Sequence, residues 1–379
     1  MSEPKTPLQL VQSARLVVVK VGTGVLSGPA GSGIDRRRIE QLAEDLALLH
    51  KRGKQVILVS SGAIGAGMGI LGWTQRPREL ARSQAAAAVG QGHLMQSYTT
   101  AFSRHGINVA QVLLTREDLI NRRRYLNARQ TMRALLKEGV LPVVNENDTV
   151  SVEEIRFGDN DELSALVAQL MDAELLVILT DVDGFEMREI HGHREPVPLV
   201  ERITPEMERS AGGTSRETSS GGMISKLHAA RIVMASGIGM LLANGAKPGI
   251  LKTLLLDGHL TGTFFLPSRK GRLGGRKRWL AFTAKPRGQV RVDAGAKRAL
   301  VSEGRSLLAS GVRTVLGPFL RGDLVSVRDE EGREFARGLI NYPDAELDRI
   351  RGMRSEAIAT LLGRRAEEVV HRDSMVILE

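Results

Sequence analysis

The sequence predicts an α/β fold: a three-layer, doubly wound, mostly parallel sheet, followed by a small β-rich domain at the C-terminus. Short apolar runs alternate with segments of helical periodicity as far as residue 267, which is the pattern of repeated βαβ units. Polar or glycine-rich stretches follow these runs, at the strand ends where open α/β sheets bind ligands. Beyond residue 279 the chain changes to short alternating segments broken by Gly and Pro, which predicts the second domain.

The composition is that of a globular chain. With 379 residues, 42% of them hydrophobic and 25% charged, the chain has room for two domains with separate cores. The absence of cysteine excludes disulfides, thiolate nucleophiles and Cys-type zinc sites. Residues 1–12 lack the basic flank and apolar core of a secretory signal, and no apolar run approaches the ~20 residues that span a bilayer. We therefore expect a soluble, cytoplasmic protein without membrane contact.

The net charge of +10 is unevenly distributed. Residues 268–379 contain 23 Lys and Arg against 15 Asp and Glu, whereas residues 1–267 contain 30 against 28. The basic character therefore belongs to the last third of the chain. It is typical either of contact with a polyanion such as RNA or of a face solvated by arginine, and the second interpretation is slightly favoured.

The sequence predicts two domain boundaries. The α/β domain covers residues 13–267, where the alternation of strands and helices ends. Residues 268–278 are basic and contain glycine, which is typical of a linker. The small β-rich domain then covers residues 279–379.

The first strand is the most informative. Leu16–Val19 is a short apolar run of the kind that forms a strand buried on both faces. It is followed by Lys20 and by the turn residues Gly22 and Gly24. Glycines let backbone N–H groups approach a phosphate, and the ammonium group supplies a countercharge. An edge-strand lysine before an ordinary turn explains the same residues, so this stretch alone leaves both interpretations open.

The following segments repeat this arrangement. Residues 34–52 have helical periodicity, and 55–59 form a second apolar run, which together make a βαβ unit with parallel strands. The Ser/Gly run at 60–67 offers hydroxyl groups and bare backbone at the ligand edge, although close helix packing explains the glycines equally well. The sequence predicts further strands at 109–114, 140–145, 175–179 and 240–243, helices at 83–102, 125–137, 163–171 and 224–236, and a hairpin at 151–157.

Polar side chains gather where these strands end. Residues 145–148 and 158–162 form two acidic clusters, and residues 219–223 precede a helix that carries Lys226 near its start. Asp and Asn are good helix caps, so capping explains either cluster alone but less easily both. Glycines before a helix that bears a lysine make a plausible anion site.

These residues are typical of phosphoryl transfer, which requires positive charge around the moving group. The set consists of Lys20 and Lys226 with Asp148, Asp159, Asp161 and Asp181. Lysines can hold the phosphates while carboxylates bind Mg²⁺ and orient the lysines. The candidate loops contain no histidine, and an acceptor carboxylate needs no general base because it is already ionised. The chain lacks a Walker P-loop and a typical dinucleotide fingerprint, so the residues alone predict a nucleotide-dependent phosphotransferase of another kind.

Five motifs, in this order along the chain, resemble those of the glutamate 5-kinases within the amino acid kinase family. They are Val19-Lys20-Val21-Gly22-Thr23, Ser61-Gly62-Ala63-Ile64, Asn145-Glu146-Asn147-Asp148, Gly158-Asp159-Asn160-Asp161 and Gly221-Gly222-Met223 with Lys226. The tail motifs Gly304-Arg305-Ser306-Leu307-Leu308, Gly311-Val312 and Gly317-Pro318-Phe319 resemble the PUA domain of many bacterial members.

The resemblance implies transfer of the ATP γ-phosphoryl group to the side-chain carboxylate of L-glutamate, the first step of proline biosynthesis. It also implies Mg²⁺ as cofactor, inhibition by L-proline, and a homodimer or homotetramer. Lys20 and Lys226 would stabilise the transferred group, and Asp159 and Asp161 would organise the site. L-Glutamate would contact Ser61, Asp148 and Asn160. ATP would contact Lys20, Thr180, Asp181, Ser220, Gly221, Gly222, Met223, Ile224, Ser225 and Lys226.

The chain departs from the family pattern in two places. Ser219-Ser220 replaces the usual Gly-Thr before Gly-Gly-Met, and Gly184-Phe185-Glu186-Met187 replaces a Gly-Leu-Tyr segment that leads to Asp-Pro. Two alternatives stay open. One is another kinase of this fold, with N-acetylglutamate, aspartate, carbamate or UMP as acceptor. The other is an RNA-binding PUA protein, for which the 3% aromatic content offers little stacking surface.

Overall fold

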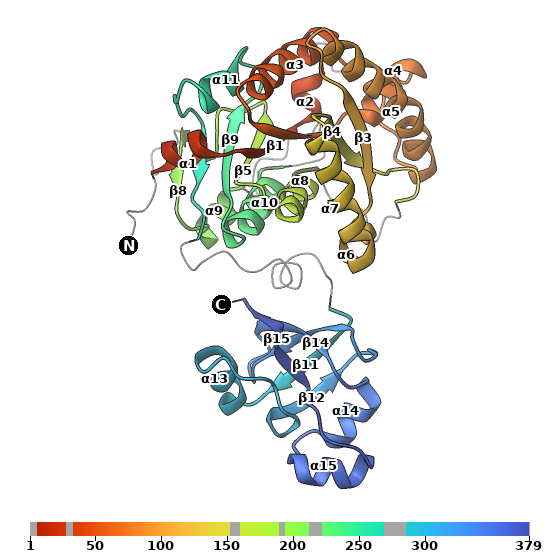
Figure 1. Cartoon of the computed structure of the whole chain (residues 1–379), viewed down its shortest axis with the longest axis vertical. Helices are drawn as coiled ribbons and strands as arrows, with labels where there is room; N and C mark the ends of the chain where they lie inside the picture. The colour runs from red at the N-terminus through yellow and green to blue at the C-terminus, as the bar shows by residue number, and fades with distance from the viewer. Residues whose placement is uncertain are drawn as a thin grey trace. The chain divides into compact units, whose positions relative to one another are not determined.

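The computed structural model describes residues 6–27, 33–151, 160–188, 194–211, 222–268 and 286–378. The chain divides into two compact units, residues 1–272 and residues 273–379 (Figure 1). Residues 269–285 lie outside the described residues, so the domain boundaries at 267 and 278 stay a prediction. Within the described ranges, no helix combines the length and the apolar character that crossing a membrane would require.

The first unit contains the expected parallel sheet. Eight strands follow the order β3-β4-β2-β1-β5-β9-β10-β8, and the first six are parallel to one another. β10 runs antiparallel to β9 and parallel to β8 at the far edge. The strands are β1 Leu16–Val21, β2 Gln55–Ser60, β3 Val109–Leu114, β4 Leu141–Glu146, β5 Leu175–Thr180, β8 Leu199–Val200, β9 Gly239–Asn244 and β10 Thr263–Phe265.

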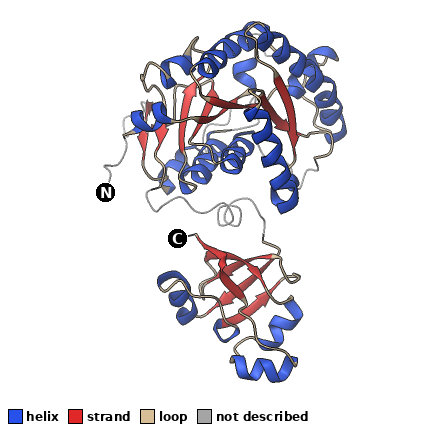
Figure 2. Cartoon of the chain, viewed as in Figure 1, coloured by secondary structure: helices blue, strands red, loops and turns tan. Residues whose placement is uncertain are grey.

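Helices cover both faces of this sheet, which gives the three layers predicted from the sequence (Figure 2). One layer contains α1 Pro7–Ser13, α3 Arg36–Lys51, α5 Leu80–Ser103 and α11 Ile250–Leu255. The other contains α7 Arg122–Lys137, α8 Asn160–Met171 and α10 Met223–Ala235. The shorter elements are α2 Thr23–Leu26, α4 Ala63–Ile70, α6 Arg116–Ile120, α9 Pro205–Ala211 and the hairpin of β6 Glu186–Arg188 and β7 Arg194–Pro196.

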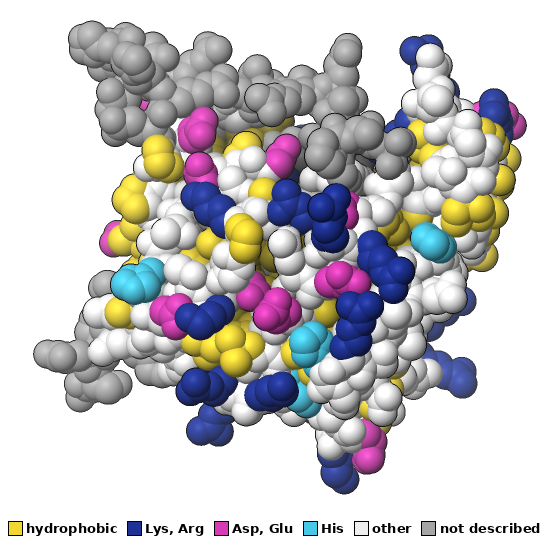
Figure 3. Space-filling model, turned by 90° about the horizontal axis from the view of Figure 1, so that it is seen from above, with side chains coloured by type: hydrophobic (Ala, Val, Ile, Leu, Met, Phe, Trp, Pro, Cys, Tyr) yellow, Lys and Arg dark blue, Asp and Glu magenta, His cyan; other side chains and the backbone are white. Residues whose placement is uncertain are grey.

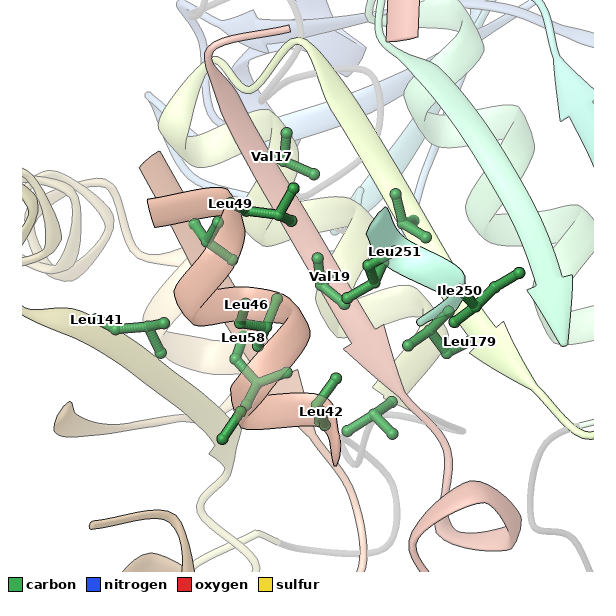
Figure 4. Close-up of a cluster of buried hydrophobic side chains, with 14 of the residues drawn as sticks. Val17, Val19, Leu42, Leu46, Leu49, Leu58, Leu141, Leu179, Ile250 and Leu251 are labelled. Atoms are coloured by element: carbon green, nitrogen blue, oxygen red, sulfur yellow. The ribbon is translucent and has the colours of Figure 1, made fainter. Parts of the chain in front are cut away.

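The core on the α3 side explains the orientation of the central strand. Val17, Val19 and Val21 pack in one buried cluster with α3 and α11 (Figure 4). The buried leucines of α3 recur at helical spacing, so one face of the helix lies on the sheet. Because successive strand residues point to opposite faces, Lys20 points away from this cluster, towards the layer of α8 and α10.

Two glycines let α4 and α5 approach closely. A Cβ on Gly67 would lie 1.8 Å from the Ala86 carbonyl oxygen, and a Cβ on Gly90 would lie 1.8 Å from the Ala63 carbonyl oxygen. Gly62 has a different role, since its φ of 103° starts α4 from the left-handed region that glycine favours. At Gly67, therefore, helix packing explains the Ser/Gly run better than exposure at the ligand edge.

The second unit has a five-stranded sheet of its own, in the order β12-β11-β13-β14-β15. Its core buries Val290, Phe335 and Tyr342 among other side chains. The expected short strands are present, with one more at the C-terminal end. The elements are β11 Gly288–Val292, α13 Ala294–Ser302, the 3₁₀ helix Ala309–Gly311, β12 Val312–Leu316, β13 Leu324–Arg328, β14 Glu334–Ile340, α14 Asp344–Ile350, α15 Ser355–Leu362 and β15 Val370–Ile377.

The sequence did not show where the main sheet changes direction. The connection at 245–262 is long enough for a parallel crossover, and a three-residue strand carries no signal of its direction, so the antiparallel β10 was not foreseen. Residues 152–159, which contain most of the predicted hairpin, lie outside the described residues.

Candidate active site

Lys20, Asp161 and Lys226 come together at the carboxyl ends of the strands. Lys20 Nζ lies 2.5 Å from Asp161 Oδ1, and Lys226 Nζ lies 3.1 Å from Asp161 Oδ2. Ser225 Oγ donates a hydrogen bond of 2.9 Å to the same Oδ2. We call these four residues the lysine–carboxylate cluster. Asp161 is fully buried, and the lysines are 3% and 6% exposed. A shared carboxylate thus holds two ammonium groups together, and the formal charges of these four residues sum to +1.

The start of α10 adds backbone donors to this positive charge. Gly222 is its N-cap, no side chain caps the helix there, and its first turn contains no acidic residue. The first N–H groups of a helix have no partner within it and favour an anion. Lys226 lies one turn into α10, and helical side chains lean towards the N-terminus. The ammonium group and the helix end therefore favour the same negatively charged ligand.

A second cluster, made of neutral groups, lies beside the first. Asn160 Nδ2 donates to the Ser60 carbonyl oxygen at 2.8 Å, to Ser61 Oγ at 2.9 Å and to Asn145 Oδ1 at 3.0 Å. Asn145 Nδ2 in turn donates to Gln91 Oε1 at 2.8 Å. We call Gln91, Asn145, Asn160 and Ser61 the amide cluster. It joins the ends of β2 and β4 to the helices α5 and α8 without any formal charge.

The first three residues of α8 each contact a different part of the fold. Asn160 bonds to the ends of β2 and β4, and Asp161 pairs with lysines from β1 and α10. Glu162 Oε1 lies 2.8 Å from Arg116 Nη2 of α6, in a largely buried ion pair. The backbone at the start of α8 is therefore fixed from three directions, and this places the two clusters side by side.

A buried phenol contacts Ser60, which directly precedes Ser61 of the amide cluster. Tyr98 of α5 is fully buried, and its hydroxyl oxygen lies 2.8 Å from Ser60 Oγ. Ser60 Oγ donates to the Ser61 carbonyl oxygen at 3.0 Å, so Tyr98 supplies the proton of the first bond. Burial raises the pKa of the Tyr98 phenol, and the hydrogen bond with Ser60 opposes this increase only in part.

The loop after β5 lies next to the loop after β1. Thr180 Oγ1 donates to Asp181 Oδ1 at 3.1 Å, and a Cβ on Gly24 would lie 3.7 Å from Asp181 Oδ2. Two residues on, Asp183 accepts hydrogen bonds from Lys247 and Asn244, which hold the pKa of its carboxyl group below the usual range. The loop after β5 thus adds hydroxyl and carboxylate groups close to Gly24, in the segment that follows β1.

The remaining predicted residues divide into two groups. Asp148 is half-buried in the turn after β4, and Gly222, Met223 and Ile224 start α10. Asp159, Ser220 and Gly221 lie outside the described residues. The structure therefore brings together Lys20, Asp161, Ser225 and Lys226, and separately Ser61 with Asn160, while the roles assigned to all these residues stay predictions.

Gln91 and Tyr98 belong to none of the motifs, although the sequence contains a signal for both. Ala87, Leu94 and Phe102 form the buried face of α5, and Gln91 and Tyr98 fall on that face at helical spacing. A polar group on an apolar helix face must find a partner when it is buried. That pattern identifies both residues as candidates for buried hydrogen bonds, without showing where their partners lie.

No cluster of three metal-ligating side chains is present within the ranges that the structure describes. Asp161, the most buried carboxylate at this edge, pairs with two lysines. Mg²⁺ prefers one or two carboxylates together with substrate phosphates and water. The residues described here fit a magnesium ion that arrives with a nucleotide better than one held by the protein alone.

A family model for the amino acid kinase family matches residues 15–244. The chain belongs to the amino acid kinase family. A PUA domain model matches residues 288–362 of the second unit. Both units thus have the fold that the motifs predicted.

Curated relatives resemble this amino acid kinase over its whole length. A glutamate 5-kinase from Moorella thermoacetica is 49% identical over 100% of both chains. One from Pelobacter propionicus is 47% identical over 98% of this chain and 99% of its own. Among solved structures, carbamate kinase from Giardia lamblia bound to AMP-PNP has a TM-score of 0.50 at 16% identity, over 68% of this chain and 100% of its own. At that identity the likeness concerns the fold alone.

Proposed function

We propose that this chain transfers the γ-phosphoryl group of ATP to the side-chain carboxylate of L-glutamate, giving L-glutamyl 5-phosphate and ADP. The observation that carries the proposal is the pair of buried lysines on Asp161, with Nζ–oxygen distances of 2.5 and 3.1 Å. The full-length relatives named glutamate 5-kinase support the choice of acceptor.

The chemistry follows from the charges in the cluster. A carboxylate oxygen of the acceptor attacks the γ-phosphorus, and the bond to the oxygen that bridges the β- and γ-phosphorus breaks. Negative charge moves to that bridging oxygen, so cations that are already in place lower the barrier. Lys20 and Lys226 supply two of them. Asp161 takes no proton, because the acceptor is ionised at neutral pH. It keeps the lysines at a fixed separation, and Asp159 assists in organising the site.

The substrates are assigned to the two clusters. L-Glutamate contacts Ser61 and Asn160 of the amide cluster, where neutral donors and acceptors select its shape, and also Asp148 in the turn after β4. ATP, as its Mg²⁺ complex, contacts Thr180, Asp181 and the segment 220–226, where the helix end and Lys226 favour phosphate. In this arrangement the acceptor carboxylate and the γ-phosphate meet over Lys20.

A hydroxamate assay tests the activity directly. Purified protein, Mg²⁺-ATP, hydroxylamine and L-glutamate should yield γ-glutamyl hydroxamate, because hydroxylamine traps an acyl phosphate. N-Acetyl-L-glutamate and L-aspartate serve as alternative acceptors, and ADP release is followed in parallel. Product from one of these acceptors but not from L-glutamate would assign another kinase of this fold. No ADP release with any acceptor would contradict the proposed activity.

Lys226→Ala is the matching variant. Removing one cation from the lysine–carboxylate cluster should lower turnover at least about 100-fold, the effect expected for a group that stabilises charge in the transition state. An unchanged circular dichroism spectrum and melting temperature would show that the fold survives. Turnover close to wild type would remove Lys226 from the mechanism.

The family resemblance supports three further parts of this proposal: a cytoplasmic enzyme of proline biosynthesis, inhibition by L-proline, and a homodimer or homotetramer. L-Proline in the same assay and the mass in solution by light scattering test the last two. RNA as a partner is the weaker alternative, because many arginines of the second unit form ion pairs. Among them are Arg313 with Asp293, Arg321 with Glu367, Arg337 with Glu334 and Arg364 with Glu346.

A further inference from the structure

The amide cluster has a direction that two backbone groups determine. Asn145 Oδ1 accepts from the Glu146 N–H at 2.9 Å, and a backbone N–H can only donate. Asn160 Nδ2 donates to the Ser60 carbonyl oxygen at 2.8 Å, and a backbone carbonyl can only accept. Neither amide can therefore rotate by 180° without placing two donors or two acceptors against each other.

This direction extends to Gln91. Because Asn145 Oδ1 faces Glu146 and Asn160, Asn145 Nδ2 must face α5, where Gln91 Oε1 accepts its hydrogen bond at 2.8 Å. Gln91 Nε2 is then turned the other way. It is buried and has no hydrogen-bond acceptor among the described residues. An apolar residue would avoid the cost of that buried donor but would also remove the acceptor that Asn145 requires.

At the other end, the direction decides what Asn160 offers a ligand. The Nδ2 hydrogens are shared among Ser60, Ser61 and Asn145, so the end of the amide that has no partner among the described residues is the carbonyl oxygen Oδ1. An oxygen acceptor selects a hydrogen-bond donor. At neutral pH the donor of L-glutamate is its α-ammonium group, because both of its carboxyl groups are ionised.

The two backbone groups determine which way each amide faces, and we propose that Gln91 is a positioning residue that holds Asn145 in place, so that Asn145 Oδ1 keeps Asn160 and its Oδ1 in position for the amino-acid substrate. The preference of the enzyme for an acceptor that carries an α-ammonium group then depends on a side chain of α5 that does not touch that acceptor. This inference rests on the proposed function and adds the origin of its selectivity. Tyr98 supports the same arrangement by fixing Ser60.

The experiment compares L-glutamate with glutarate, which has the same two carboxylates but lacks the ammonium group. We expect Gln91→Met, which keeps the size but removes the acceptor, to lower kcat/KM for L-glutamate about tenfold, the effect of about one hydrogen bond. The value for glutarate and the KM for ATP should stay the same. Gln91→Glu, which keeps an acceptor oxygen, should retain the preference for L-glutamate and provides a second variant if Gln91→Met fails to fold.

Gln96→Met is the matched control, because Gln96 is exposed on the same helix. It should behave as wild type. An unchanged ratio of kcat/KM for L-glutamate to kcat/KM for glutarate in Gln91→Met, whether both values fall equally or neither falls, would overturn the positioning role while leaving the kinase activity established. The same ratio in Gln91→Met and Gln91→Glu would also overturn it. Wild-type protein that makes no hydroxamate from L-glutamate would contradict the proposed function itself.

Discussion

The lysine–carboxylate cluster and the amide cluster lie side by side, yet they depend on different physics. Asp161 balances two buried ammonium groups, so its contribution depends on charge and is tolerant of small rotations. Asn160, the preceding residue, makes neutral hydrogen bonds whose value depends on which end of each amide faces which neighbour. The lysine–carboxylate cluster thus suits the stabilisation of charge that moves during a reaction, and the amide cluster suits the recognition of the shape of a substrate.

The surface seen in Figure 3 differs from the lysine–carboxylate cluster in how its charges are arranged. Its Lys and Arg side chains lie beside Asp and Glu side chains, so that face is not a patch of one sign. The ammonium groups of Lys20 and Lys226 are instead buried in the lysine–carboxylate cluster, where water screens their charges less than at the surface. Changing charge should therefore affect one cluster strongly and the other weakly.

The largest effect is expected from Asp161→Asn. An amide offers one oxygen for two ammonium groups and turns a donor towards one of them. Removing one partner of a buried pair costs about 3–5 kcal/mol in the free energy of unfolding, and we expect kcat to fall at least about 100-fold. Denaturant unfolding and the hydroxamate assay measure the two quantities. The KM for L-glutamate should change much less than kcat, because the amide cluster keeps its bonds.

Asp257→Asn provides the control for stability. Asp257 lies 2.6 Å from Lys252, but both side chains are more than a third exposed. An exposed pair contributes about 0–1 kcal/mol, so this variant should unfold close to wild type. Similar losses in the two variants would mean that burial does not distinguish the cluster from an ordinary ion pair.

The second largest effect concerns the helix that carries Gln91. Gly90→Ala would place a methyl group 1.8 Å from the Ala63 carbonyl oxygen, so α4 and α5 would have to separate. We expect a loss of about 3 kcal/mol in the free energy of unfolding, at the upper end for overpacked cores. Because α5 also holds Asn145, the KM for L-glutamate should rise more than the KM for ATP.

Gly92→Ala is the matched substitution on the same helix. Nothing lies within 4 Å of the Cβ that it would add, and alanine is the better helix former by about 1 kcal/mol. This variant should be as stable as wild type or slightly more stable. A comparable loss in Gly92→Ala would show that the close approach of α4 is not the reason for the glycine at 90.

The same contrast explains what the sequence could predict. Lys20 is identifiable because it interrupts a run of valines, and Asp161 and Lys226 because they belong to motifs at strand ends. A charged residue within an apolar run can be recognised from the sequence alone, because charged side chains are rarely buried. The six parallel strands were predictable for a similar reason, since each is a short apolar run.

Ser61, Asn145 and Asn160 also belong to these motifs, but the hydrogen bonds that join them to Gln91 could not be predicted. Gln91 contacts Asn145 only because α5 lies against the ends of β2 and β4, and helical periodicity does not determine which strand end a helix covers. The Asn145 amide takes its direction from the N–H of the next residue, Glu146, but the Asn160 amide takes its direction from the carbonyl oxygen of Ser60, which lies 100 positions away in the sequence. Contacts between residues so far apart in the sequence can be determined only from the three-dimensional structure.

The smallest effect is expected from Tyr98→Phe, which removes one buried hydrogen bond beneath the amide cluster. The loss should be about 1 kcal/mol at neutral pH, with kcat unchanged, because Ser60 keeps its bond to the Ser61 carbonyl oxygen. Denaturant unfolding of the variant and wild type measures it.

The stability difference between wild type and Tyr98→Phe should also depend on pH, in a direction that the pKa of Tyr98 determines. Burial raises the pKa of the Tyr98 phenol in the folded state above its unfolded value of about 10. The group therefore contributes stability that is fully present below pH 10 and is lost as the pH rises, because the unfolded chain releases its proton first. The stability advantage of wild type over Tyr98→Phe should shrink above pH 10. A constant difference from pH 7 to pH 11 would mean that the phenol is not buried in this way, and the support assigned to Ser60 would fail with it.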